Sequence, residues 1–176
     1  MNIRDISQRL RRERGQALIE FILVLPMIFL LIMNLVNFGG FFYAWITVAN
    51  AARAGANYAI LGGASVGGLA APSGANVSGV ITEDVKSLPN NASVSVNACQ
   101  INDSSGTPKT TSLVGSCASM SSLPTDPEPS NYVITVVDVT YTYQPFIAAF
   151  SFPSLGVYLT LPPTTVYQRA VMRSIQ

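Results

Sequence analysis

The side chains that could carry acid–base chemistry are few and scattered in this sequence. It contains no histidine, so the usual proton shuttle near neutral pH is missing. Glu83 and Asp84 are neighbours, Asp126 and Glu128 belong to a proline-rich stretch, and Asp138 stands alone in an apolar segment. None of these forms a recognisable acid/base pair, and no P-loop, Gly-x-Ser-x-Gly elbow or dinucleotide fingerprint occurs. We therefore expect a protein that is not an enzyme and that uses no cofactor.

The only cysteines are Cys99 and Cys117, which lie 18 residues apart in a stretch rich in serine, threonine and asparagine. Zinc sites draw on several cysteine or histidine ligands, so no metal site of this kind is expected. The spacing favours a disulfide formed in an oxidising compartment, with a pair of free thiols as the alternative.

The net charge of +1 conceals an uneven distribution. Residues 1–15 hold five arginines against Asp5 and Glu13, a net charge of +3, and the remainder carries a net charge of −2. Once this basic leader is set aside, no basic face remains for a phosphate backbone. We therefore expect no nucleic acid among the partners.

Directly after the leader, residues 17–36 read ALIEFILVLPMIFLLIMNLV, 20 residues with one formal charge. A helix of that length spans about 30 Å, the thickness of a hydrocarbon core, which predicts a transmembrane helix in preference to a buried helix of a soluble protein. The arginines before it place the N-terminus in the cytoplasm and everything after the helix outside. Pro26 lacks the N–H that the helix needs, so we expect a bend there.

The helical pattern continues beyond the apolar run to about residue 61, giving a helix over 16–61 that lies half in lipid and half outside. An aromatic group over residues 38–45 suits the outer membrane interface. Val48, Ala52, Gly55 and Ala59 then form a stripe of small residues that a partner backbone could approach. The sequence Ala49-Asn50-Ala51 resembles a signal-peptidase site, but its distance from the apolar run argues against simple secretion.

The remainder predicts a small α+β head over residues 79–176, joined by a flexible Gly/Ala/Ser linker over 62–78. One short amphipathic helix, capped by Ser78, precedes Pro89. Alternating segments at 92–98, 132–143 and 157–161, the last continuing after Pro162-Pro163, predict an antiparallel sheet. The prolines confine that last segment to an edge or split it. The apolar residues 144–156 either complete the core or contact a membrane or partner.

The stretch RGQALIEFILVLP is followed by FGGFFYAWITVANAARAGANYA, and the pattern covers about residues 13–59. In order and spacing it resembles the N-terminal signature of the TadE-like family, minor pilin-like proteins of bacterial tight-adherence (Flp-type) pilus systems. The resemblance implies a leader cut after Gly15 by a prepilin peptidase, which leaves Gln16 as the new N-terminus and Glu20 as the fifth residue. It also implies other minor pilin-like subunits and a pilus assembly platform as partners.

A charge at the centre of a membrane helix costs roughly 2.5 to 3.5 kcal/mol on insertion scales. Glu20 lies near the inner interface, where the cost is smaller, and the resemblance implies that it pairs with the mature amine of a neighbouring subunit. The aromatic residue that follows it, Phe21, fits the same pattern. The alternative is a carboxylate that reaches the cytoplasmic interface or pairs with Arg14.

These observations predict a single-pass protein of the bacterial cytoplasmic membrane that takes part in pilus assembly or surface adherence. The alternatives are an uncleaved, signal-anchored protein whose head binds a ligand or envelope component, and a domain secreted by signal peptidase.

Overall fold

The computed structural model describes residues 3–61, 73–102, 109–124, 132–148 and 151–175, apart from 153 and 155. It contains two α-helices and six strands in these parts of the chain: α1 (Ile3–Leu61), α2 (Gly74–Val85), β1 (Ser95–Asn102), β2 (Lys109–Val114), β3 (Tyr132–Tyr143), β4 (Ser151–Phe152), β5 (Val157–Tyr158) and β6 (Thr164–Ile175). Short 3-10 turns, η2 (Asn91–Ser93) and η3 (Cys117–Ser119), precede β1 and follow β2. The expected α+β class is confirmed.

The chain divides into two compact units. The anchor unit comprises residues 1–40 and 145–162, and the head unit comprises residues 41–144 and 163–176. Helix α1 contributes its first part to the anchor unit and its second part to the head unit. The expected helix was to begin at residue 16, whereas α1 begins at Ile3. The leader contains no proline and is rich in arginine, a good helix former, so nothing before Gly15 interrupts the helix.

The head unit is built on an antiparallel sheet with the strand order β2-β1-β3-β6. Strand β3 pairs with β6 along its whole length, from Tyr132 opposite Ile175 to Tyr143 opposite Thr164. Its other neighbour is β1, with Ser95 opposite Thr140. The prolines at 162 and 163 separate β5 from β6, and β6 forms an edge of the sheet, as expected from the sequence. The expectation that residues 157–161 belong to this sheet is wrong, because β5 covers only Val157–Tyr158 and pairs with β4 in a separate two-stranded sheet.

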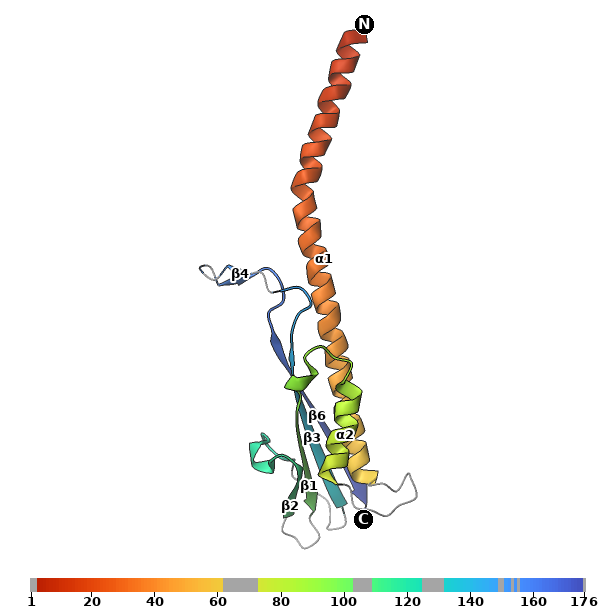
Figure 1. The fold of residues 1–176 in the computed structure, drawn as a ribbon, viewed down its shortest axis with the longest axis vertical. Helices are drawn as coiled ribbons and strands as arrows, with labels where there is room; N and C mark the ends of the chain where they lie inside the picture. Colours follow the sequence, from red (N-terminus) through yellow and green to blue (C-terminus); the bar gives the residue numbers. More distant parts are fainter. Residues whose placement is uncertain are drawn as a thin grey trace. The chain divides into compact units, whose positions relative to one another are not determined.

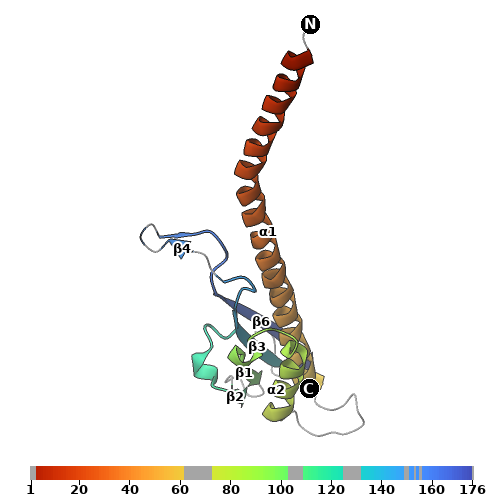
Figure 2. The same cartoon turned by 45° about the horizontal axis from the view of Figure 1, so that its top comes forward.

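One face of this sheet is covered by α2 and by the head part of α1 (Figures 1 and 2). A Cβ atom added at Gly55 would lie 2.5 Å from Ile81 Cδ1 on α2 and 3.7 Å from Val137 on β3. The small residues of α1 therefore let the chain's own α2 and sheet approach closely. The expectation that a partner backbone would use this stripe is wrong, because the stripe is buried within the head: Val48, Ala52 and Ala59 are at most 1% exposed, and Gly55 is buried with them.

The opposite face of the sheet carries a second core around the segment after β2. Its members are Cys99, Ile101, Met120, Ile134 and Val136, with Cys117 and Leu123 packed against them. Strand β3 is thus covered on both faces, which explains why consecutive residues such as Val136 and Val137 are both apolar and fully buried. Cys99 and Cys117 are joined by a disulfide with their Cα atoms 5.7 Å apart, and this bond fastens η3 to the central part of the sheet.

Three further sequence-based predictions differ from the structure. Helix α2 begins at Gly74 and not after Ser78, because the hydroxyl of Ser73 caps it by accepting from the Asn76 N–H at 3.2 Å. The earlier start adds Val77 to the buried face formed by Ile81 and Val85. Residues 73–78 are therefore not linker, and residues 62–72 lie outside the described part of the chain.

The other two differences concern the sheet. Strand β1 starts at Ser95, three residues later than expected, since Asn91–Ser93 form the turn η2. Strand β2 was not expected at all. Its sequence, KTTSLV, is polar at the start and exposed over most of its length, as suits an edge strand that carries little hydrophobic signal.

Candidate functional site

The first part of α1 is an apolar helix without cover in the described structure. Every side chain from Gln16 to Phe29 is exposed, and the large apolar ones among them are between 45% and 76% exposed. Burying each such side chain is worth about 1.5 to 3 kcal/mol, so water is a poor solvent for this helix. From Gln16 onward the helix is long and apolar enough to cross a membrane. This segment is the candidate functional site.

Glu20 lies on the exposed surface at the start of this segment. The side-chain amide of Gln16 donates to Glu20 Oε1 at 3.2 Å, because residues four apart share one face of a helix. Phe21, the next residue, is 61% exposed. The end of the chain that a cut after Gly15 would create therefore lies one helical turn from the carboxylate.

The expected cleavage position lies within α1, since the helix runs through Gly15 and Gln16 without a break. Proteases bind their substrates extended, so a cut here requires local opening of the helix. A glycine inside a helix costs about 1 kcal/mol relative to alanine, which makes Gly15 a weak point of the segment. Pro26 also lies inside α1, and the helix continues on both sides of it.

The exposed stretch ends where two asparagines hold a distant part of the chain. The Asn34 side chain donates to the Leu159 carbonyl at 2.9 Å and to the Leu30 carbonyl at 2.9 Å. Asn37 donates to the Ile147 carbonyl at 3.2 Å and accepts from the Ile147 N–H at 3.0 Å. Asn37 is fully buried although both of its neighbours in the chain are exposed. The two amides thus tie residues 145–162 to the last turns of the apolar run.

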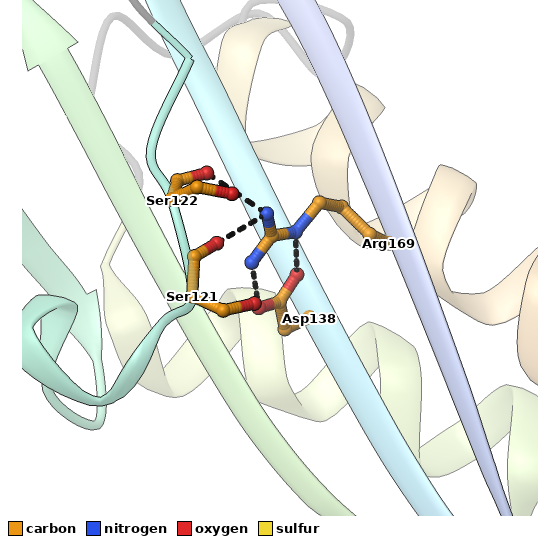
Figure 3. A network of polar contacts seen from close by, with 4 residues as sticks. All are labelled: Ser121, Ser122, Asp138 and Arg169. Atoms are coloured by element: carbon orange, nitrogen blue, oxygen red, sulfur yellow. Dashed lines mark hydrogen bonds and ion pairs between the residues drawn. The ribbon is translucent and has the colours of Figure 1, made fainter.

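In the head, a charged pair links three segments (Figure 3). Arg169 on β6 donates from Nε and from a terminal nitrogen to the two carboxylate oxygens of Asp138 on β3, both at 2.7 Å. Its other terminal nitrogen donates to the carbonyls of Ser121 at 2.7 Å and Ser122 at 3.0 Å. The hydrogen bond with Asp138 raises the pKa of Arg169, with burial acting in the opposite direction. Arg169 therefore stays charged and, through its hydrogen bonds, holds the segment after η3 against the sheet.

This arrangement corrects the reading of Asp138 as a lone acid, and it does not suggest catalysis. The guanidinium of Arg169 donates to Asp138, Ser121 and Ser122, which is a structural network, and it lies 5.8 Å from the ring centre of Tyr167. Among the described residues, no group of three or more His, Cys, Asp or Glu side chains is placed to hold a metal ion.

Three contacts were not predicted from the sequence. They are the hydrogen bonds of Asn34 and of Asn37 to residues 145–162, and the pairing of Asp138 with Arg169. A signal existed for the first two. In LIMNLVNFGG the asparagines are three residues apart on one helix face within an apolar context, where each amide needs a polar partner. The Asp138–Arg169 pair follows from the register of β3 with β6, which the sequence alone leaves open.

Comparison with known protein families gives a match that lies within helix α1. A model of the family described as TadE-like protein matches residues 15–57. The searches of curated proteins and of solved structures gave no match. The matched stretch lies entirely within α1; it begins at Gly15 and ends among the small residues that pack in the head. The resemblance noted in the sequence is thereby confirmed, and residues 15–57 form a TadE-like family domain.

Proposed function

We propose that the protein is a pilin-like membrane protein that acts in the assembly of an adherence pilus. The observation that carries this proposal is that the TadE-like domain begins with an apolar helical segment, residues 16–29, that is exposed on all sides. A lipid bilayer or a bundle of similar helices would cover such a surface. The arginines before the helix favour a cytoplasmic N-terminus and a head outside the cytoplasmic membrane.

The proposal includes maturation by a prepilin peptidase after Gly15. The cut removes five arginines and two acids and leaves an α-amine on Gln16. That amine is largely protonated at neutral pH, since its ordinary pKa is about 7.7 to 8.0. A single positive charge at the helix start then replaces the basic leader.

Glu20 has the second role in the proposal. In a dry bundle of helices a carboxylate is tolerated only when a positive group meets it with good geometry. The new amine of a neighbouring subunit would supply that group and would fix the register between packed helices. The further partners are other minor pilin-like subunits and the pilus assembly platform.

Replacing Glu20 by glutamine tests this role, because the change removes the charge and keeps the shape. In cells that make the complete pilus system, Glu20→Gln should leave the membrane-extracted amount of protein unchanged and should abolish its assembly with other subunits. Asp84→Asn, on the exposed surface of α2, is the matched control and should assemble normally. Normal assembly of Glu20→Gln, together with poorer insertion, would show that the acid serves membrane insertion instead.

One observation favours a second candidate. Because α1 passes through Gly15 without interruption, the chain is also suited to remain uncleaved as a signal-anchored protein whose head binds a ligand or envelope component outside the membrane. Under that function the leader arginines stay attached, and no α-amine forms beside Glu20.

A further inference from the structure

The segment over residues 145–162, called here the hairpin segment, is unusually poor in charge. No Asp, Glu, Lys or Arg occurs from residue 139 to residue 168. The hairpin segment also contains the short paired strands β4 and β5, with Ser151 opposite Tyr158. Segments of this composition on a water-facing surface are uncommon, because exposed loops are ordinarily polar.

Two of its described aromatic side chains are exposed despite being apolar. Phe146 is 62% exposed and Tyr158 is 61% exposed. Tyrosine and other aromatic side chains are enriched at the boundary between lipid and water, where the ring lies against lipid and the polar end reaches water. The described part of the hairpin segment therefore presents the residue types that favour a membrane surface.

The contacts with α1 fix the level of the hairpin segment along the helix. Ile147 and Leu159 are bound by the amides of Asn37 and Asn34, which lie at the end of the apolar run over residues 17–36. Helix residues 16–29 are exposed on every side, and partial burial begins only at Leu30. If the run spans the hydrocarbon layer, these contacts lie at the outer headgroup level.

The direction of the segment agrees with that level. In both views of the fold, β4 lies to the side of α1 and does not run along it (Figures 1 and 2). Irregular backbone cannot face hydrocarbon without hydrogen-bond partners. The asparagine amides supply partners at two points, and headgroups and water supply them in the interfacial layer.

We propose that the hairpin segment is a second membrane-contacting element, which lies in the outer interfacial layer of the bilayer with Phe146 and Tyr158 among the lipid headgroups. The occupant of this surface is lipid and not a protein partner, because the surface continues directly from the helix that enters the bilayer. It would hold the end of the transmembrane helix at a fixed depth before assembly begins. The inference rests on the proposed function only in requiring that α1 spans a membrane.

Tryptophan fluorescence in lipid vesicles tests the depth of the segment. The chain has a single tryptophan, Trp45, so Trp45→Phe provides a background without one. In the full-length protein, Phe146→Trp and, separately, Tyr158→Trp report on the hairpin segment, and Leu25→Trp reports on the middle of the span. Lys86→Trp, on the exposed end of α2, is the water-facing control.

The vesicles contain phosphatidylcholine and phosphatidylglycerol with a nitroxide label either at the headgroup or at the middle of the acyl chain. Position 146 and position 158 should lose more fluorescence to the headgroup label than to the mid-chain label. Position 25 should show the reverse order, and position 86 should respond to neither.

The outcomes separate the inference from the proposed function. If position 25 is quenched by the mid-chain label while positions 146 and 158 respond to neither label, the helix spans the membrane and the hairpin segment contacts water or protein, so the inference fails alone. Stronger quenching of positions 146 and 158 by the mid-chain label also overturns the interfacial placement. If position 25 responds to neither label, the membrane span fails, and the proposed function fails with it.

Discussion

At the scale of single residues, Asp138 is a carboxylate in the middle of a buried strand, and Arg169 makes this position tolerable. The side chains are 5% and 21% exposed, and they are joined by two hydrogen bonds of 2.7 Å. A buried pair of this kind adds little net stability compared with apolar residues, yet removing one partner leaves an uncompensated charge. Its value here lies in fixing the segment after η3, through the carbonyls of Ser121 and Ser122.

Arg169→Met should therefore lower the free energy of unfolding by about 3 kcal/mol, since it leaves Asp138 buried and unpaired. Adding Asp138→Leu should recover part of this loss, because the buried charge is then gone. Urea unfolding of the full-length protein in detergent micelles, followed by near-ultraviolet circular dichroism, measures the free energy of unfolding of the single and the double variant. Arg53→Met, at an exposed position of α1, is the control and should change stability by no more than about 0.5 kcal/mol. Additive losses in the double variant would contradict the coupling.

The buried tyrosine of β3 makes stability depend on pH at the alkaline end. Burial, followed by the nearby Tyr143, raises the pKa of Tyr141 above its ordinary value of 10.0, and its hydroxyl donates to the Pro89 carbonyl. Above pH 10 the unfolded chain releases this proton while the folded chain keeps it, so the folded state loses stability as the pH rises.

For this single proton, the free energy of unfolding should fall by at most about 1.4 kcal/mol per pH unit between pH 10 and the raised pKa. Tyr141→Phe should flatten the decline, although it lowers stability at neutral pH by removing the hydrogen bond. Urea titrations at a series of pH values from 8 to 11 would measure the slope. An equal slope in the two proteins would mean that Tyr141 is not the group responsible.

At the scale of elements, the packing of α1 on α2 depends on the lack of a side chain at Gly55. A Cβ there would lie 2.5 Å from the tip of the Ile81 side chain, so Ile81 must move. Gly55→Ala should therefore destabilise the head by about 1 to 3 kcal/mol, the usual cost of overpacking. Its matched control is Gly79→Ala, inside α2, where nothing lies within 4 Å of the added atom.

The control should stabilise by up to about 1 kcal/mol, since alanine is a better helix former than glycine. Thermal unfolding of both variants in micelles gives the comparison. If Gly55→Ala were as stable as Gly79→Ala, the close approach of the two helices would not matter for the fold.

The elements with strong periodicity could be predicted from the sequence, and those held by distant contacts could not. The β3 boundaries were predicted at residues 132–143, because this segment alternates, is rich in β-branched and aromatic residues and follows a proline-rich stretch. Strand β2 was missed because its residues are polar and its place depends on pairing with β1. The start of α2 was placed too late because two serines, Ser73 and Ser78, are both plausible caps, and only burial of Val77 decides between them.

The candidate site likewise combines local features, which the sequence reveals, with contacts between distant residues, which it does not. The apolar run, the leader and Glu20 are local features, so sequence alone identified them. Asn37 is different, because its partner Ile147 lies 110 residues away. The packing partner of the small-residue stripe was also predicted wrongly. Small residues allow close approach by another subunit or by the chain's own head, and the sequence does not distinguish the two.

At the scale of the whole molecule, the two units differ in whether their apolar side chains are buried. The head unit buries its apolar residues on both faces of the sheet and is fastened by a disulfide and a buried ion pair. The anchor unit keeps its apolar side chains exposed. Such a division is expected of a protein in which one part faces water and the other faces lipid or neighbouring helices.

Under the proposed function, the chain exists in two states that differ in whether the leader is attached. With residues 1–15 attached, the helix start carries the leader's net charge of +3. Without them, the helix begins with one amine, one turn from Glu20. Only the second state has the charges that the proposed pairing between subunits requires.

The mass of the N-terminal peptide in protein isolated from membranes of the producing cells tests this account most directly. We expect a chain that begins at Gln16, and we expect Gly15→Leu to leave the leader attached because the backbone can no longer open as readily at the cut. A chain that begins at Met1, in cells that assemble pili containing it, would contradict the central claim.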